Sequence, residues 1–192
     1  MFKKIIEPKN ICQFWVVGVV LIYGLIMSEY FSNLNSKVFA IDAAELTNSS
    51  IYSFFISFSF FVMLITVFVI WLIFSFTFHL CAILLGGVST FGDFLKYTGI
   101  SYILPTIGFL IAFILSESIL LPNDKIFDFL NSNKTFVTIN WVINISFLLY
   151  YFLLIPIIKY LYKINWLKAI GAIAIPLGSI FLLGQLFSKF IF

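Results

Sequence analysis

Five stretches of this 192-residue chain are almost entirely apolar, and each is long enough to cross the roughly 30 Å hydrocarbon core of a bilayer. Backbone N–H and C=O groups in lipid must be bonded within the chain, and no strand-like alternation of apolar and polar residues appears. Each stretch is therefore predicted to be a helix. The predicted spans cover approximately residues 14–30, 51–85, 97–121, 136–162 and 166–192.

The composition excludes both a soluble fold and a disordered chain. Hydrophobic residues make up 62% of the sequence, charged residues 10%, and the mean hydropathy is +1.14. A 22.0 kDa globule has too little interior to bury so much apolar surface, and disorder requires low hydrophobicity. The predicted fold class is all-α. One domain, residues 1–192, forms a polytopic integral membrane bundle of five transmembrane helices surrounded by membrane lipids.

The placement of the lysines predicts the orientation of the bundle. With a cytoplasmic N-terminus, seven lysines fall on inner segments and four on outer ones, which agrees with the positive-inside rule. We therefore expect the N-terminus inside and the C-terminus outside. The first span could instead belong to a cleaved secretory signal, but its length favours a helix that is retained.

The second apolar stretch is longer than a bilayer requires. It has 35 residues from Ile51 to Leu85, which corresponds to about 52 Å of helix. We expect its inner end, including His79, to project from the hydrocarbon, and Gly86-Gly87 to end the helix as a left-handed cap. His79 could pair with Asp93 across the following loop, although a purely structural histidine is the simpler interpretation.

Two predicted helices carry small residues along one face. Helices in lipid associate closely where such residues allow the backbones to approach, so both faces are predicted to contact other helices. The small-residue positions are Ser101, Pro105, Gly108, Ala112 and Ser116 in the third span, and Gly171, Ala174 and Gly178 in the fifth.

Polar residues within the spans gather at the predicted outer ends. One hypothesis is that Glu29, Glu117, Asn140 and Asn144 surround an outward-facing, water-filled cleft, because ionisable groups at membrane depth often have a function. The alternative is that the two glutamates reach the outer interface and the two asparagines bond to neighbouring helices.

No pattern in the sequence predicts an enzyme, a metal site or a cofactor. Carboxylates without a histidine beside them are a weak metal signal, and His79 is predicted to lie at the opposite end from the two glutamates. Nucleophile-elbow, zincin, Walker and kinase motifs are absent. The net charge of +3 is scattered and the chain has no arginine, so a nucleic-acid partner is not expected.

The loop after the second span carries a recognisable pattern. It resembles the core signature of the Yip (Ypt/Rab-interacting protein) domain family of five-span membrane proteins, and the likeness covers about residues 50–190. The residues that carry it are His79-Leu80, Leu84-Leu85-Gly86-Gly87, Ser89, Phe91, Gly99, Tyr102 and Pro105, followed by Lys168-Ala169 and Pro176.

The resemblance implies an accessory role in a membrane. Eukaryotic members carry a long cytosolic N-terminal region that engages Rab GTPases, whereas about 12 residues precede the first span here. Rab binding is therefore not expected, and the chain resembles a prokaryotic member in a bacterial cytoplasmic membrane. Bacterial relatives are linked with ABC exporters and with defence against antimicrobial peptides.

The inner loop is predicted to be a docking surface. Gly86 and Gly87 permit a tight reversal, Phe91 holds the loop at the interface, and His79, Asp93 and Lys96 face the cytoplasm. The first functional hypothesis is a non-enzymatic adaptor for another membrane protein, with self-association into a homo-oligomer left open. A bacteriocin immunity protein follows, then a transporter or lipid-handling protein using the outer cleft, and last a membrane enzyme.

Overall fold

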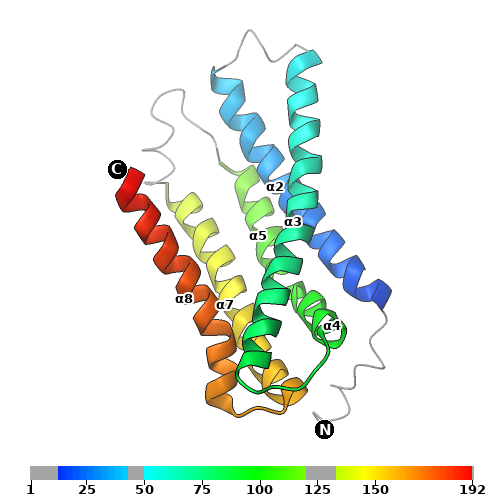
Figure 1. The fold of residues 1–192 in the computed structure, drawn as a ribbon. Helices are drawn as coiled ribbons and strands as arrows, with labels where there is room; N and C mark the ends of the chain where they lie inside the picture. The colour runs from blue at the N-terminus through cyan, green and yellow to red at the C-terminus, as the bar shows by residue number, and fades with distance from the viewer. Residues whose placement is uncertain (1–12, 43–49, 120–132, 192) are drawn as a thin grey trace. The chain divides into compact units, whose positions relative to one another are not determined.

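The described part of the chain consists of helices joined by short loops. The computed structural model describes residues 13–42, 50–119 and 133–191. The segment 126–130, whose apolar residues after Pro122 predict a short interfacial helix, lies outside these residues, as does Cys12. In chain order the helices are α2 (Gln13–Asp42), α3 (Ser50–Leu84), α4 (Phe91–Ser101), α5 (Ile103–Glu117), α7 (Lys134–Tyr162) and α8 (Trp166–Ile191) (Figure 1).

Five helical segments are long and apolar enough to cross a membrane, as the sequence predicts. The third of these segments combines α4 and α5 and runs from Phe91 to Glu117, so it begins six residues before the predicted start at 97. The reason is a local cap. The N–H of Asp93 donates to Thr90 Oγ1 at 3.2 Å and the Thr90 hydroxyl donates to Asp93 Oδ2 at 2.8 Å, which stabilises the first turn of α4.

A turn at Tyr102 separates α4 from α5, and a proline explains its position. Pro105 has no N–H, so the C=O of Ser101 lacks the donor that a continuous helix would supply. The helical pattern resumes at once, because the N–H of Thr106 donates to the C=O of Tyr102 at 2.9 Å. In contrast, α7 and α8 continue as single helices through Pro156 and Pro176.

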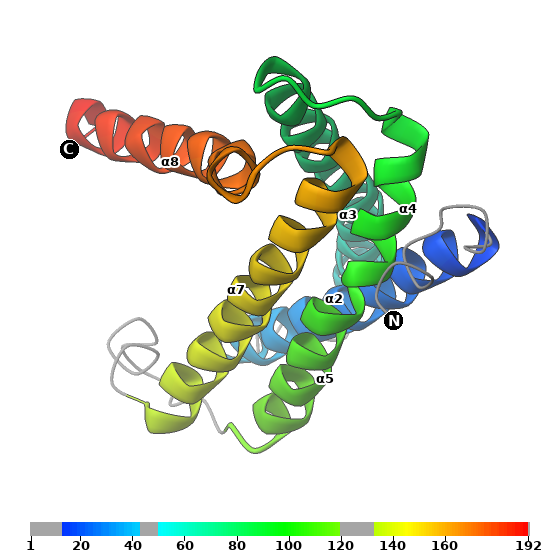
Figure 2. The same cartoon turned by 90° about the horizontal axis from the view of Figure 1, so that it is seen from below.

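The structure divides into two compact units, which we describe separately. Of the described residues, unit 1 contains 13–16, 70–101 and 151–191. Within it, α4 packs against α3 and the last turns of α7 (Figure 2). Thr98 Oγ1 accepts hydrogen bonds from Trp71 Nε1 at 3.2 Å and Ser75 Oγ at 2.9 Å. This buried polar contact fixes α4 on α3.

Of the described residues, unit 2 contains 17–42, 50–69, 102–119 and 133–150, and it is built around aromatic rings. The ring of Tyr23 meets those of Tyr102 and Phe109 edge to face, with centroids 5.0 and 5.5 Å apart. A side chain at Gly108 would place its Cβ only 2.5 Å from Ser146 Cβ, so this glycine is what allows α5 and α7 to approach closely.

One of the two predicted small-residue faces is a packing face, and the other is not. All five positions of the third-span face, from Ser101 to Ser116, are buried. In α8, however, Ala174 is exposed and nothing lies within 4 Å of a Cβ built on Gly178. The buried side of α8 consists instead of Ala169, Ala172, Ile173 and Pro176. The helix is therefore rotated relative to the prediction.

Candidate functional site

The helix α3 ends in a Schellman motif at the two predicted glycines. The N–H of Gly87 donates to the C=O of Ala82, and the N–H of Gly86 donates to the C=O of Ile83, both at 2.9 Å. Gly86 has a φ of 90°, which glycine adopts without the strain that a side chain would cause. The predicted left-handed cap is confirmed.

The helix α7 ends in the same motif, with lysine in the position that glycine usually takes. Lys163 has a φ of 57°, and the N–H of Ile164 donates to the C=O of Lys159 at 3.2 Å. The next helix begins at once, because Asn165 Oδ1 accepts the N–H of Lys168 at 2.9 Å and caps α8. The turn between α7 and α8 is therefore only residues 163–165 long.

Main-chain contacts tie the α3–α4 loop to the end of α7. The N–H of Val88 donates to the C=O of Tyr162 at 3.1 Å. A Cβ on Gly87 would lie 2.7 Å from the Ala82 carbonyl oxygen and 2.8 Å from Tyr162 Cβ, so the loop reaches Tyr162 only because residue 87 is glycine. The α3–α4 loop is thus packed directly on the last residue of α7 and held there by a main-chain hydrogen bond.

Tyr162 is the central side chain of this region, and sequence reasoning missed it. Its hydroxyl shares a hydrogen bond of 2.5 Å with His79 Nδ1, and its ring meets Phe94 edge to face at 5.6 Å. The ring of Phe91 also contacts His79, with the two ring centroids 5.4 Å apart. The only sequence signal for Tyr162 is its place as an aromatic residue at the end of a span.

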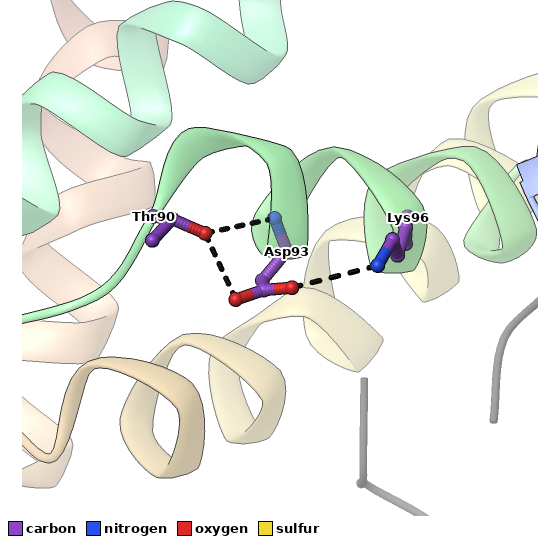
Figure 3. Close-up of polar contacts among 3 residues, drawn as sticks. All are labelled: Thr90, Asp93 and Lys96. Carbon is purple, nitrogen blue, oxygen red and sulfur yellow. Dashed lines mark hydrogen bonds and ion pairs between the residues drawn. The ribbon is translucent and has the colours of Figure 1, made fainter. Parts of the chain in front are cut away.

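Of the two interpretations of His79, the pairing with Asp93 does not form. Asp93 accepts the hydrogen bond from the Thr90 hydroxyl and lies 3.6 Å from Lys96 Nζ (Figure 3). These contacts lie within the loop and first turns of α4. The carboxylate is therefore satisfied locally, and His79 bonds to Tyr162 instead.

Cationic and apolar side chains surround the tied loops. Lys159 Nζ lies 4.1 Å from the ring centroid of Trp166, a cation–π contact, while Lys163 and Lys168 are exposed. Leu84, Val88 and Leu167 have exposed fractions between 77% and 84%. We call the exposed set the paired-loop surface; it consists of Leu84, Val88, Lys163, Leu167 and Lys168.

The four residues predicted to line the outer cleft all lie in unit 2, and all four are exposed. Glu117 accepts a hydrogen bond from the side-chain amide of Asn33, a residue that sequence reasoning missed. Lys37, one turn further along α2, donates to the C=O of Ser116 at 2.7 Å and so caps the C-terminus of α5. These contacts hold the ends of α2 and α5 together.

Glu29, Asn140 and Asn144 take no part in those contacts. Within residues 13–42, 50–119 and 133–191, no hydrogen bond or ion pair joins any two of the four predicted cleft residues. A groove of about 230 Å³ does lie between α5 and α7, but none of the four lines it. Its lining is Leu104, Ile107, Gly108, Ile111, Val142, Ile145, Ser146 and Leu149.

The described residues contain no group of three histidine, cysteine, aspartate or glutamate side chains that could hold a metal ion. Comparison with known proteins does not assign the chain to a family. No family model, curated protein or solved structure matches it. The resemblance to the Yip family therefore stays a prediction that depends on the residues around Gly86 and Gly87.

Proposed function

We propose that this chain is a non-enzymatic integral membrane protein that acts as an adaptor or accessory subunit for another membrane protein. The observation that carries the proposal is the paired-loop surface. Two loops far apart in the sequence are locked together by the Val88–Tyr162 hydrogen bond and by the fit of Gly87 against Tyr162. Because the two loops are already held together, the paired-loop surface can bind a partner through its apolar and cationic side chains with little loss of backbone entropy.

The charge of this region supports a cytoplasmic position for the paired-loop surface. The segments that build and flank the tied loops, residues 70–101 and 151–169, contain four lysines and one acid. The acid, Asp93, already lies beside Lys96, which leaves Lys159, Lys163 and Lys168 as uncompensated positive charges. Positive charge concentrates on the cytoplasmic side of membrane proteins. The proposed partner therefore offers an acidic, partly apolar cytoplasmic segment.

The Yip resemblance points in the same direction. The residues that carry it include His79, Gly86, Gly87 and Phe91, which build and support the tied loops. The proposed setting is a bacterial cytoplasmic membrane, with an ABC exporter or an antimicrobial-peptide defence system as the partner. The groove between α5 and α7 has an almost wholly apolar lining, which gives less support to a transporter with a polar cleft.

Site-specific photo-crosslinking in native membranes tests the adaptor role. A crosslinker at Val88 or Leu167 should capture one membrane protein in stoichiometric yield, whereas one at the exposed Phe181 of α8 should not. The double change Lys163→Glu and Lys168→Glu should abolish the capture by reversing the charge, and Lys134→Glu in unit 2 should leave it intact. Equal capture by all variants, or no capture from Val88 and Leu167, would refute the proposal.

The orientation is tested separately with membrane-impermeant thiol reagents. In a background with Cys12→Ser and Cys81→Ser, Lys163→Cys should be labelled only from the cytoplasmic side. Ser118→Cys, at the C-terminus of α5, should be labelled only from outside. Labelling of both positions from one side would overturn the proposed topology. It would not change the interpretation of the photo-crosslinking experiment.

A further inference from the structure

An exposed seam runs along α7 within unit 2. Val137, Trp141, Asn144 and Leu148 are all exposed and follow each other at spacings of four, three and four residues. Residues at this spacing stay on the side of a helix that faces its partner in a left-handed coiled coil. Asn140 is also exposed and flanks the seam on the same side of the helix. We call these five residues the α7 seam.

The two asparagines make this seam unlike an ordinary lipid-facing surface. Asn144 is ten residues from the start of α7, so it lies about 15 Å along the helix axis and well within the proposed span. Neither carboxamide makes a hydrogen bond to another residue within the described ranges. A carboxamide exposed to hydrocarbon lacks any solvent that could satisfy it, and this is costly.

Thr138 on α7 and Thr66 on α3 do not share this problem. The Thr138 hydroxyl donates to the C=O of Lys134 at 2.8 Å, and the Thr66 hydroxyl donates to the C=O of Val62 at 2.7 Å. These hydroxyls are satisfied by their own helices. An asparagine carboxamide has two donors and one acceptor oxygen, and the described chain satisfies none of them at positions 140 and 144.

We propose that the α7 seam binds the α7 seam of a second copy of this chain, forming a symmetric dimer within the membrane. The inference rests on the proposed membrane setting but not on the docking role of the paired-loop surface. Two copies inserted with the same orientation are related by a two-fold axis along the membrane normal. Their α7 helices then run parallel, and each seam residue lies at the same depth as its own copy.

A second copy is the occupant that the chemistry of the seam favours. A carboxamide donates and accepts at once, so Asn144 is complementary to Asn144 of the second copy. In paired helices, a polar residue within an apolar seam can specify the register and the number of helices that associate, at a cost in stability. Trp141 and Leu148 would pack against their counterparts on either side of the asparagine, which excludes lipid from the hydrogen bonds.

Cysteine crosslinking in membranes tests the geometry of the dimer. In the Cys12→Ser, Cys81→Ser background, Leu148→Cys should form a disulfide-linked dimer between tagged and untagged copies of the chain. Leu149→Cys is the matched control, because its native side chain is 50% exposed against 54% for Leu148 but points about 100° away around the helix. Equal crosslinking at both positions, or a crosslink to a different protein, would overturn the proposal.

Dilution in liposomes tests the role of the carboxamides. With fluorescently labelled protein, Asn140→Leu together with Asn144→Leu should weaken dimerisation about tenfold, as expected for the loss of interhelical hydrogen bonds in a membrane. Thr138→Val should leave dimerisation unchanged, because that hydroxyl is bonded within its own helix. Asn144→Gln should retain most of the affinity. A monomeric wild type, or leucine variants that dimerise as well as wild type, would contradict the dimer.

Two further measurements separate failure of the dimer from failure of the membrane setting. A chain that is released from membranes by alkaline carbonate refutes the setting itself. If the chain stays in the membrane but its Asn144→Cys variant reacts fully with water-soluble maleimide, the seam is hydrated. This outcome refutes the dimer in favour of an aqueous cleft.

Discussion

The N–H of Val88 donates a hydrogen bond to the C=O of Tyr162 across 74 positions of sequence, with the two atoms 3.1 Å apart. This contact joins the loop after α3 to the last residue of α7. It requires a close approach of two backbones, and Gly87 is the residue that permits it. The stability of unit 1 should therefore respond sharply to changes at this point.

Replacing Gly87 with alanine should destabilise the protein by about 2 kcal/mol, because the added Cβ meets a backbone carbonyl and Tyr162 at distances that neither can easily relieve. Unfolding in mixed detergent micelles, followed by tryptophan fluorescence, measures the change. Gly92→Ala is the control, since nothing lies within 4 Å of a Cβ there and alanine favours a helix. Equal losses for both variants would show that the fit at Gly87 is unimportant.

Tyr162→Phe should cost about 1 kcal/mol of unfolding free energy, because it removes one partner of the His79–Tyr162 hydrogen bond and leaves the imidazole nitrogen unpaired. The double variant with His79→Phe removes both partners, so its loss should be smaller than the sum of the two single losses. A full double-mutant cycle measures this coupling. Strict additivity would mean that the two side chains do not interact.

Lys163→Gly should stabilise the isolated chain by about 1 kcal/mol, because glycine adopts the left-handed conformation at the end of α7 without the strain of a side chain. Lys163→Val should instead destabilise it, since a β-branched residue tolerates that conformation poorly. Thermal unfolding in detergent compares the three proteins. A loss of stability in the glycine variant would indicate that the lysine side chain itself contributes contacts.

Gly108→Ala should cost about 1 to 3 kcal/mol, because its Cβ would overlap the Ser146 side chain and force α5 away from α7. Adding Ser146→Gly removes the obstructing side chain and should recover part of this loss. Gly178→Ala in α8 should be neutral or stabilising, since that position is open. If Ser146→Gly brings no recovery in the Gly108→Ala background, the helices do not meet where the structure places them.

The features that could be predicted from the sequence are those that depend on neighbouring residues. Helices long enough to span a membrane follow from unbroken apolar stretches, and the end of α3 follows from Gly86-Gly87. The face from Ser101 to Ser116 follows from helical periodicity, and its residues are buried as predicted. In each case the information lies within one helix or one turn.

The features that were missed depend on contacts between distant segments. The bond between His79 and Tyr162, and the bond between Asn33 and Glu117, each join residues more than 80 positions apart. Periodicity says that Asn140 and Asn144 share a face of α7, but not which way this face points. Lys163 was missed for another reason, since its left-handed conformation occurs where glycine would normally be expected.

Main-chain hydrogen bonds close the ends of α3 and α7 and link the two ends to each other. A scaffold held in this way imposes few requirements on the side chains that project from it. Val88 and Leu167 could be exchanged for other residues while the backbone beneath them stays in place. Recognition at this surface can therefore diverge between relatives, or be redesigned in the laboratory, without the fold having to be rebuilt.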